Sequence, residues 1–213
     1  MNEMKCLYCS YQGTFQPNDI LCPLCHQPLV FDPAQMAHSR LFPREKLALQ
    51  QYQEFLPLRR VDPRLSLQEG STPLLSLSRL EKYLSQENLF AKLEAANPTL
   101  SFKDRGTAVV VQKLTEMKIK KIGTVSTGNM ASSTAAYAAR SGLQTFLLVK
   151  KGTSAGALIS SAVFGPVIIE VEGDYGQLFY KSYELGKKYG IYFANSVDPL
   201  RIEGYKLTSF EIC

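Results

Sequence analysis

One stretch of this 213-residue chain decides its fold: Asn97-Pro98-Thr99-Leu100-Ser101-Phe102-Lys103-Asp104-Arg105-Gly106. Ser101 and Asp104 have the spacing of a capping box, which predicts that a helix begins here, after a buried strand over residues 88–93. Lys103 would then lie in the first helical turn, among unpaired N–H groups at the positive end of the helix dipole. That field favours the neutral amine, the form that attacks a carbonyl to make a Schiff base. A lone lysine beside a helix cap is more often an ordinary surface residue, so the other motifs must decide whether Lys103 has a chemical role.

A second motif is the turn Ser126-Thr127-Gly128-Asn129, which follows a short apolar strand over residues 121–125. A helix over 131–140 and a strand over 145–149 come next, and this order predicts a βαβ unit with parallel strands. The pattern recurs more loosely over 167–194. A turn between a parallel strand and a helix presents free backbone N–H groups that can bind an anion. On spacing alone, an anion site and a simple capped helix start are equally good interpretations.

Two Cys-x-x-Cys pairs stand near the N-terminus, Cys6 with Cys9 and Cys22 with Cys25. Two such pairs across a short loop are typical of a closed, structural Zn²⁺ site with four thiolate ligands. A segment of roughly 30 residues cannot build its own core, so a bound metal would stabilise it. Disulfides are the main alternative, but no secretory signal is visible and a reducing cytosol disfavours them. A thioredoxin-like redox pair is less favoured, because no βαβ pattern surrounds the cysteines.

The composition is that of an ordinary globular protein, with 45% hydrophobic and 20% charged residues. No apolar run approaches the roughly 20 residues that span a bilayer, and the N-terminus lacks the apolar segment of a signal peptide. We therefore expect a cytoplasmic protein with no membrane partner. The formal net charge of +5 is mild and the basic residues are spread along the chain, so we expect no nucleic-acid partner either.

The segment from Ser101 to Gly106 resembles the cofactor-lysine segment of the fold-type-II pyridoxal-phosphate enzymes, most closely that of the threonine synthase family. Further matches follow in the family's order: the cysteine pairs, Glu69-Gly70-Ser71-Thr72-Pro73-Leu74, the turn at 126–129, and Ile202-Glu203-Gly204-Tyr205-Lys206. The resemblance implies a three-layer α/β fold around a parallel sheet, like that of tryptophan synthase β, preceded by a small zinc ribbon. It also implies an enzyme of threonine biosynthesis, a pyridoxal-phosphate-dependent carbon–oxygen lyase.

The resemblance further assigns roles to individual residues. It makes Lys103 the catalytic residue and the attachment point of pyridoxal 5'-phosphate. It places Asn129 beside the ring oxygen of the cofactor. It assigns to Ser126, Thr127 and Gly128 the binding of the substrate carboxylate. The implied reaction converts O-phosphohomoserine and water into threonine and phosphate, and a homodimer is the oligomeric state considered. Because related folds also support threonine dehydratase and cysteine synthase chemistry, another lyase of this class is an alternative.

The motifs predict three consecutive parts of the chain. A zinc-ribbon-like module is expected at residues 1–31, a connecting arm with a short helix near 44–55 is expected at 32–65, and the first part of a catalytic domain is expected at 66–213. Within the last part, the βαβ pattern predicts a small subdomain at about 118–195. These boundaries follow from the order of the motifs along the chain.

One element of a complete cofactor site is missing from the pattern. The phosphate of the cofactor usually needs a glycine-rich loop at a helix N-terminus, and no glycine cluster follows Gly204. The chain therefore resembles the N-terminal part of a longer enzyme, incomplete at its C-terminus. The alternative from another class is an inactive remnant that serves as an interaction protein.

Overall fold

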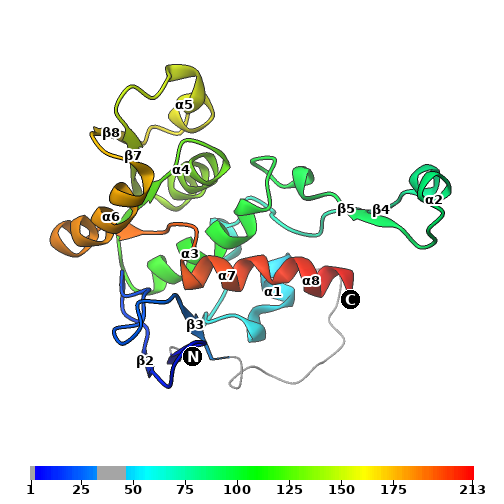
Figure 1. Ribbon diagram of the computed structural model, residues 1–213, viewed down its shortest axis with the longest axis horizontal. Coiled ribbons are helices and arrows are strands. Elements are labelled where there is room, and N and C mark those ends of the chain that lie inside the picture. The colour runs from blue at the N-terminus through cyan, green and yellow to red at the C-terminus, as the bar shows by residue number, and fades with distance from the viewer. Residues whose placement is uncertain (1–2, 33–46) are drawn as a thin grey trace.

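Four parallel strands form the central sheet of the protein, whose computed structural model describes residues 3–32 and 47–213 (Figure 1). In spatial order these strands are β8 (Val167–Val171), β7 (Gln144–Lys150), β6 (Lys121–Val125) and β9 (Tyr192–Phe193). Each neighbouring pair is parallel. The α/β class and the parallel sheet predicted from the sequence are therefore confirmed.

Three helices connect these strands, because parallel pairing requires a crossover between successive strands. They are α4 (Asn129–Ser141), α5 (Ala155–Ala162) and α6 (Tyr175–Tyr189). Helix α6 begins with a capping box between Asp174 and Gln177, and it ends at Gly190 in the left-handed conformation that glycine adopts without strain. The predicted helices at 131–140 and 175–189 are confirmed in position.

Helix α3 (Lys103–Glu116) is buried along most of its length. It packs against α7 (Pro199–Tyr205), and α8 (Leu207–Ile212) continues in nearly the same direction (Figure 1). The two backbones meet at facing glycines. A Cβ added to Gly204 would collide with the backbone of Arg105, and one added to Gly106 would lie 2.9 Å from the Arg201 carbonyl oxygen. Glycine at both positions therefore permits the close helix contact.

The N-terminal part, here called the cysteine module (residues 3–32), is a three-stranded antiparallel sheet that docks on the core. Its strands are β1 (Glu3–Cys6), β2 (Gln12–Thr14) and β3 (Leu29–Phe31), in the order β2-β1-β3. The Asn18 amide donates to the Ile191 carbonyl and accepts from the Phe193 N–H, both at 2.9 Å. Phe15 and Phe31 lie in the same buried cluster as Tyr192 of β9. The module is thus joined to the edge of the central sheet.

A second small part, here called the outlying hairpin (residues 73–96), projects away from the core (Figure 1). It pairs β4 (Leu74–Ser76) with β5 (Phe90–Lys92) antiparallel, carries α2 (Ser78–Leu84) between them, and ends in the 3-10 turn η4 (Glu94–Ala96). None of its residues is buried. The strand predicted at 88–93 is present as β5, but its predicted burial is wrong, because β5 pairs only with β4 in a separate two-stranded sheet whose residues are not buried.

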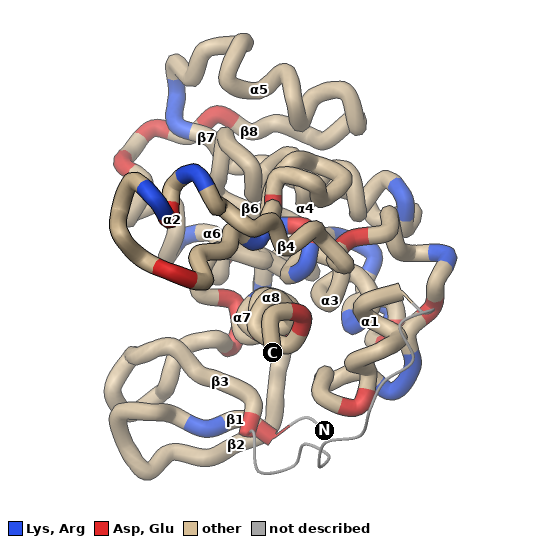
Figure 2. The backbone as a smooth tube through the Cα atoms, turned by 90° about the vertical axis from the view of Figure 1, so that its right-hand side faces the viewer, with Lys and Arg blue, Asp and Glu red and all other residues tan. Residues whose placement is uncertain are grey.

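Short helical turns lie between the cysteine module and the outlying hairpin in the chain. They are α1 (Ala48–Gln51), the 3-10 turn η2 (Gln53–Phe55) and the 3-10 turn η3 (Pro63–Leu65). Residues 44–46 of the helix predicted near 44–55 lie outside the described residues, and the remainder forms α1 and η2. Within residues 3–32 and 47–213, none of the helices has the length and apolar character needed to cross a membrane. Acidic and basic residues are spread over several elements in the view of Figure 2.

Candidate active site

Lys103 is the first residue of α3, and its ammonium group lies over two aromatic rings. Its Nζ atom lies 4.3 Å from the ring centroid of Phe102 and 5.1 Å from that of Tyr205 in α7. The side chain is half-buried. Burial lowers the pKa of Lys103, and the positive charge of Arg201 lowers it further. The lysine is thereby shifted toward the neutral amine, the form that attacks a carbonyl.

The loop before α3 differs from the predicted capping box, which is wrong. The N-cap residue is Phe102, whose side chain makes no capping hydrogen bond, and the Ser101 hydroxyl accepts only a 3.3 Å hydrogen bond from the Lys103 N–H. Asp104 instead accepts hydrogen bonds from the N–H and the hydroxyl of Thr99, at 2.6 and 2.5 Å. Leu100 has a φ of 61°, so the chain turns back and brings Thr99 rather than Ser101 to the carboxylate. Asp104 therefore closes the loop that precedes the lysine.

The turn at Ser126–Asn129 connects β6 to α4 and is open on one side. Gly128 is exposed, and a Cβ added there would meet no atom within 4 Å. No side chain caps α4. The Ala131 N–H donates to the Gly128 carbonyl oxygen at 2.8 Å, so the N–H groups of Asn129 and Met130 are the ones left free at the helix start. The Asn195 side chain accepts from the Val125 N–H at 2.9 Å and fixes the end of β6. The turn has the donors and the space that a bound anion requires.

The structure brings the starts of α3 and α4 to one place. The hydroxyls of Thr107 and Ser133 lie 2.7 Å apart. Thr107 is four residues after Lys103, and Ser133 is four residues after Asn129. Since a helix rises about 1.5 Å per residue, each start lies about 6 Å along its axis from this contact. Lys103 and the open turn at 126–129, separated in the sequence, therefore each lie about one helical turn from the same contact.

Sequence reasoning missed a buried charge network beside Lys103. Arg105 is fully buried and forms ion pairs with Glu94 at 2.7 Å and with Glu211 at 2.6 Å. Lys92 of the outlying hairpin reaches Glu211 at 2.7 Å. Burial alone would raise the pKa of Glu211, but hydrogen bonds from Arg105 and Lys92 outweigh it and lower the pKa to about 2. The network joins α3, α8 and the base of the hairpin, and only the acid–base composition of these segments hinted at it.

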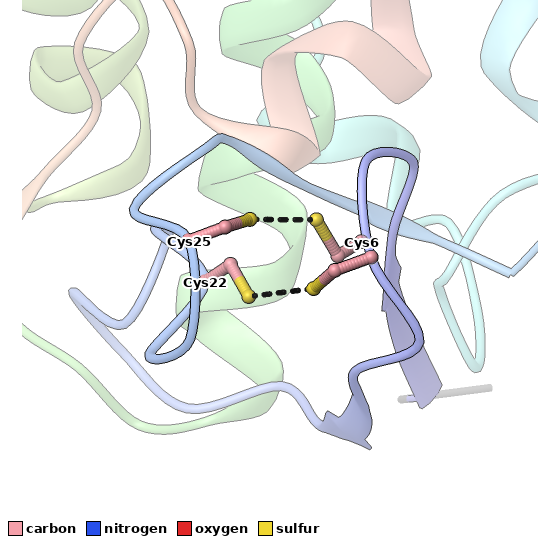
Figure 3. Close-up of side chains that lie close together, drawn as sticks. Cys6, Cys22 and Cys25 are labelled. Atoms are coloured by element: carbon pink, nitrogen blue, oxygen red, sulfur yellow. Dashed lines mark hydrogen bonds between the residues drawn. The ribbon is translucent and has the colours of Figure 1, made fainter.

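The four cysteines of the N-terminal module gather around one point, with ligand sulfur atoms within 4.8 Å of one another (Figure 3). The Sγ atoms of Cys6 and Cys25 lie 3.4 Å apart, and those of Cys9 and Cys22 lie 3.5 Å apart. All four are free thiols, with separations well beyond the ~2.05 Å of a disulfide. Backbone N–H groups of Tyr8 and Leu24 donate to Cys6 and Cys22. Four sulfur atoms in this arrangement suit a tetrahedral metal ion.

Comparisons with known proteins agree with this geometry. The family described as "Pyridoxal-phosphate dependent enzyme" matches residues 65–213. The threonine synthase of Methanocaldococcus jannaschii is 39% identical over 180 residues, which cover 84% of this chain and 44% of that protein. That of Bacillus sp. (strain ULM1) is 41% identical over 166 residues, which cover 78% and 47%. The processed form of threonine deaminase isoform 2 from Solanum lycopersicum superimposes with a TM-score of 0.59 at 22% identity, covering 66% of this chain and 39% of that one.

Fold and matches together define a class of protein, the fold-type-II pyridoxal-phosphate enzymes. The chain belongs to the family of pyridoxal-phosphate dependent enzymes. Within that family it is similar to the threonine synthases, so the resemblance predicted from the sequence motifs is confirmed. The chain spans a little under half the length of these two relatives.

Proposed function

We propose that this chain supplies the N-terminal part of a threonine synthase-like enzyme, which converts O-phosphohomoserine and water into threonine and phosphate. The observation that carries the proposal is the position of Lys103. Lys103 is the first residue of a buried helix, its pKa is lowered, and it lies near the start of α4, where an open turn offers N–H groups. The similarity of the chain to two threonine synthases favours this reaction among those of the class.

In this proposal the chain's own residues bind the cofactor and the substrate. Lys103 would hold pyridoxal 5'-phosphate through its Nζ atom and would move protons during turnover. Asn129, exposed at the start of α4, would lie beside the ring oxygen of the cofactor. The N–H groups of Ser126, Thr127 and Gly128, with the hydroxyls of Ser126 and Thr127, would bind the substrate carboxylate. When bound, the cofactor supplies an electron sink that stabilises carbanions.

We also propose that the cysteine module binds one structural Zn²⁺ ion through Cys6, Cys9, Cys22 and Cys25. The support is the tight group of four sulfur atoms and the two N–H donors directed at them. The division at 1–31, 32–65 and 66–213, with a subdomain at about 118–195, belongs to the same proposal. So do the cytoplasmic location and the homodimer.

Two measurements on Lys103 test the proposed function. Incubation of the chain with pyridoxal phosphate, followed by borohydride reduction, should leave a pyridoxyl group on Lys103. Mass spectrometry locates the modified residue. The label should disappear in Lys103→Ala and persist in Lys151→Ala, an exposed control. In the native gene product, Lys103→Ala should abolish phosphate release from O-phosphohomoserine. Normal turnover by that variant, or a label spread evenly over the surface lysines, would overturn the proposal.

A further inference from the structure

Arg201, in the first turn of α7, is fully buried, and its guanidinium donates three hydrogen bonds. Nε donates to the carbonyl oxygen of Ala194 at 2.8 Å. Nη1 donates to the hydroxyl of Thr107 in α3, and Nη2 donates to the hydroxyl of Thr134 in α4, both at 2.7 Å. All three acceptors are neutral oxygen atoms. A buried charge is costly unless it is fully hydrogen-bonded, so this group strongly constrains the elements it contacts.

The two threonines connect Arg201 to the backbone of both site segments. The Thr107 hydroxyl donates to the carbonyl oxygen of Lys103 at 3.0 Å. The Thr134 hydroxyl donates to the carbonyl oxygen of Met130, the neighbour of Asn129, at 2.6 Å. A single hydroxyl therefore separates the guanidinium from the first turn of each helix. The Thr107–Ser133 hydrogen bond joins the two helices directly beside this bridge.

The shape of the guanidinium makes this bridge specific to arginine. Its N–H donors lie in one rigid plane, so two hydroxyls bound to Nη1 and Nη2 are held at a set separation. A lysine ammonium is a single point on a flexible stem and does not impose that separation. Arg201 also carries its charge close to Lys103, where it favours the neutral amine.

We propose that Arg201 is a positioning residue, which holds Lys103 and the 126–129 turn at the spacing that the cofactor and the substrate carboxylate require. The proposal rests on the proposed function of Lys103. The other titratable groups around this pair are Asp104 on α3, Tyr205 on α7, Asp198 at the N-cap of α7, Tyr183 on α6 and Tyr192 on β9. Arg201 acts on the lysine through Thr107 and on the turn through Thr134.

The test compares two variants, because they separate spacing from charge. Arg201→Lys keeps the positive charge and loses the planar bridge, whereas Arg201→Gln loses both. The first readout is pyridoxylation of Lys103 by pyridoxal phosphate and borohydride. The second readout is the rate at which acetic anhydride labels Lys103 as a function of pH, with no cofactor present. Arg140→Gln is the matched control, since it removes one exposed positive charge from α4.

Pyridoxylation of Lys103 should fall roughly tenfold or more in both Arg201 variants, because a displaced lysine reacts poorly. Acetylation of Lys103 near pH 8 should slow about threefold to tenfold in Arg201→Gln only, because loss of the positive neighbour raises the pKa of the amine. Arg140→Gln should match the wild type in both readouts. A purely structural role would instead raise the labelling of many lysines together. Unchanged pyridoxylation of Lys103 in folded Arg201 variants would overturn the proposal.

Thr134→Val covers the case in which the Arg201 variants do not fold. It keeps the branched side chain and removes one anchor of the guanidinium. We expect lower pyridoxylation of Lys103 with a retained circular dichroism spectrum, and unchanged pyridoxylation in the folded variant would again overturn the proposal. If wild-type Lys103 is not pyridoxylated above other lysines, the proposed function fails, while the acetylation profiles still decide the role of Arg201.

Discussion

The cysteine module and the outlying hairpin are both small sheets attached to the same core, but they are attached in opposite ways. The module buries Phe15, Ile20, Leu29 and Phe31, and its Asn18 completes hydrogen bonds at the edge of the parallel sheet. The hairpin buries none of its residues and exposes large apolar side chains such as Leu75 and Phe90.

The difference shows where the stability of each part comes from. Apolar burial and internal hydrogen bonds hold the module, and four converging thiols can add a metal. The hairpin is joined to the core at its base by ion pairs. Lys92 pairs with Glu211, Glu94 pairs with Arg105, and Arg105 and Glu211 pair with each other. Its exposed apolar surface has the character of an interaction site. The following experiments test this contrast, from the largest expected effect to the smallest.

Removing the proposed metal should have the largest effect, and it should be confined to the module. Structural Zn²⁺ contributes about 10–16 kcal/mol of binding free energy in small zinc domains. Cys22→Ser should therefore lose the ion and expose residues 3–32 to proteases, while the hairpin is unaffected. Metal content by atomic emission and limited proteolysis measure this. Cys213→Ser, which changes the exposed thiol outside the cluster, should keep one Zn²⁺ per chain; equal zinc in both variants would contradict the site.

Two asparagines with positive φ allow a matched comparison of the two attachments. Asn18 has a φ of 65° and a buried side chain, whereas Asn88 in the hairpin has a φ of 58° and is exposed. Glycine tolerates both conformations, so each Asn→Gly change tests the side chain alone. Asn18→Gly should lower the free energy of unfolding by about 1–3 kcal/mol, because it leaves buried backbone groups unpaired. Urea denaturation should show a much smaller change in the free energy of unfolding for Asn88→Gly. Equal losses of unfolding free energy in the two variants would contradict the difference between the two attachments.

Acid should loosen the base of the hairpin before it affects the module. The pKa of Glu211 is about 2 in the folded protein, against an ordinary value of 4.5. The unfolded state therefore binds more protons between these values, so the stabilisation from Glu211 is full above about pH 4.5 and is lost toward pH 2. Amide hydrogen exchange within residues 73–96 should rise over this range. Glu211→Gln should show fast exchange at every pH, and a pH profile like that of the wild type would exclude Glu211 as the cause.

The smallest effect is expected on the outer surface of the hairpin. Leu80 in α2 is 42% exposed, so Leu80→Ala should change the free energy of unfolding by no more than about 0.5 kcal/mol. Denaturation of the chain by urea measures this change. A loss of 2 kcal/mol or more would mean that another surface covers Leu80 in solution, for example a second copy of the chain.

Strongly patterned segments could be predicted from the sequence. The helix at 175–189 has a capping box before it and a glycine after it, and both are local signals that the structure retains. The strands and helices of the parallel sheet alternate along the chain, so their order implied the topology. The four clustered cysteines of the module could be grouped because their spacing places them in two tight loops.

The parts that were missed depend on distant partners. The cap of α3 was mispredicted because Leu100 takes a left-handed conformation, which nothing nearby in the sequence requires. The Arg105–Glu211 pair joins residues 106 positions apart, and no local pattern links them. The strand at 88–93 looked buried because its side chains are apolar, but burial depends on which elements cover it.

The contact of α7 with α3 has a consequence for the order of folding. Arg201 and Thr107 are 94 positions apart in the chain, and the facing glycines Gly106 and Gly204 are similarly distant. Closing such a long loop costs chain entropy before the contact forms, so contacts of this kind form late and slow folding. Helix α3 therefore emerges from the ribosome well before its covering helix exists. During synthesis, the apolar surface of α3 stays uncovered until α7 is made about a hundred residues later. This is the interval in which the chain is most prone to aggregate and in which a chaperone would help most.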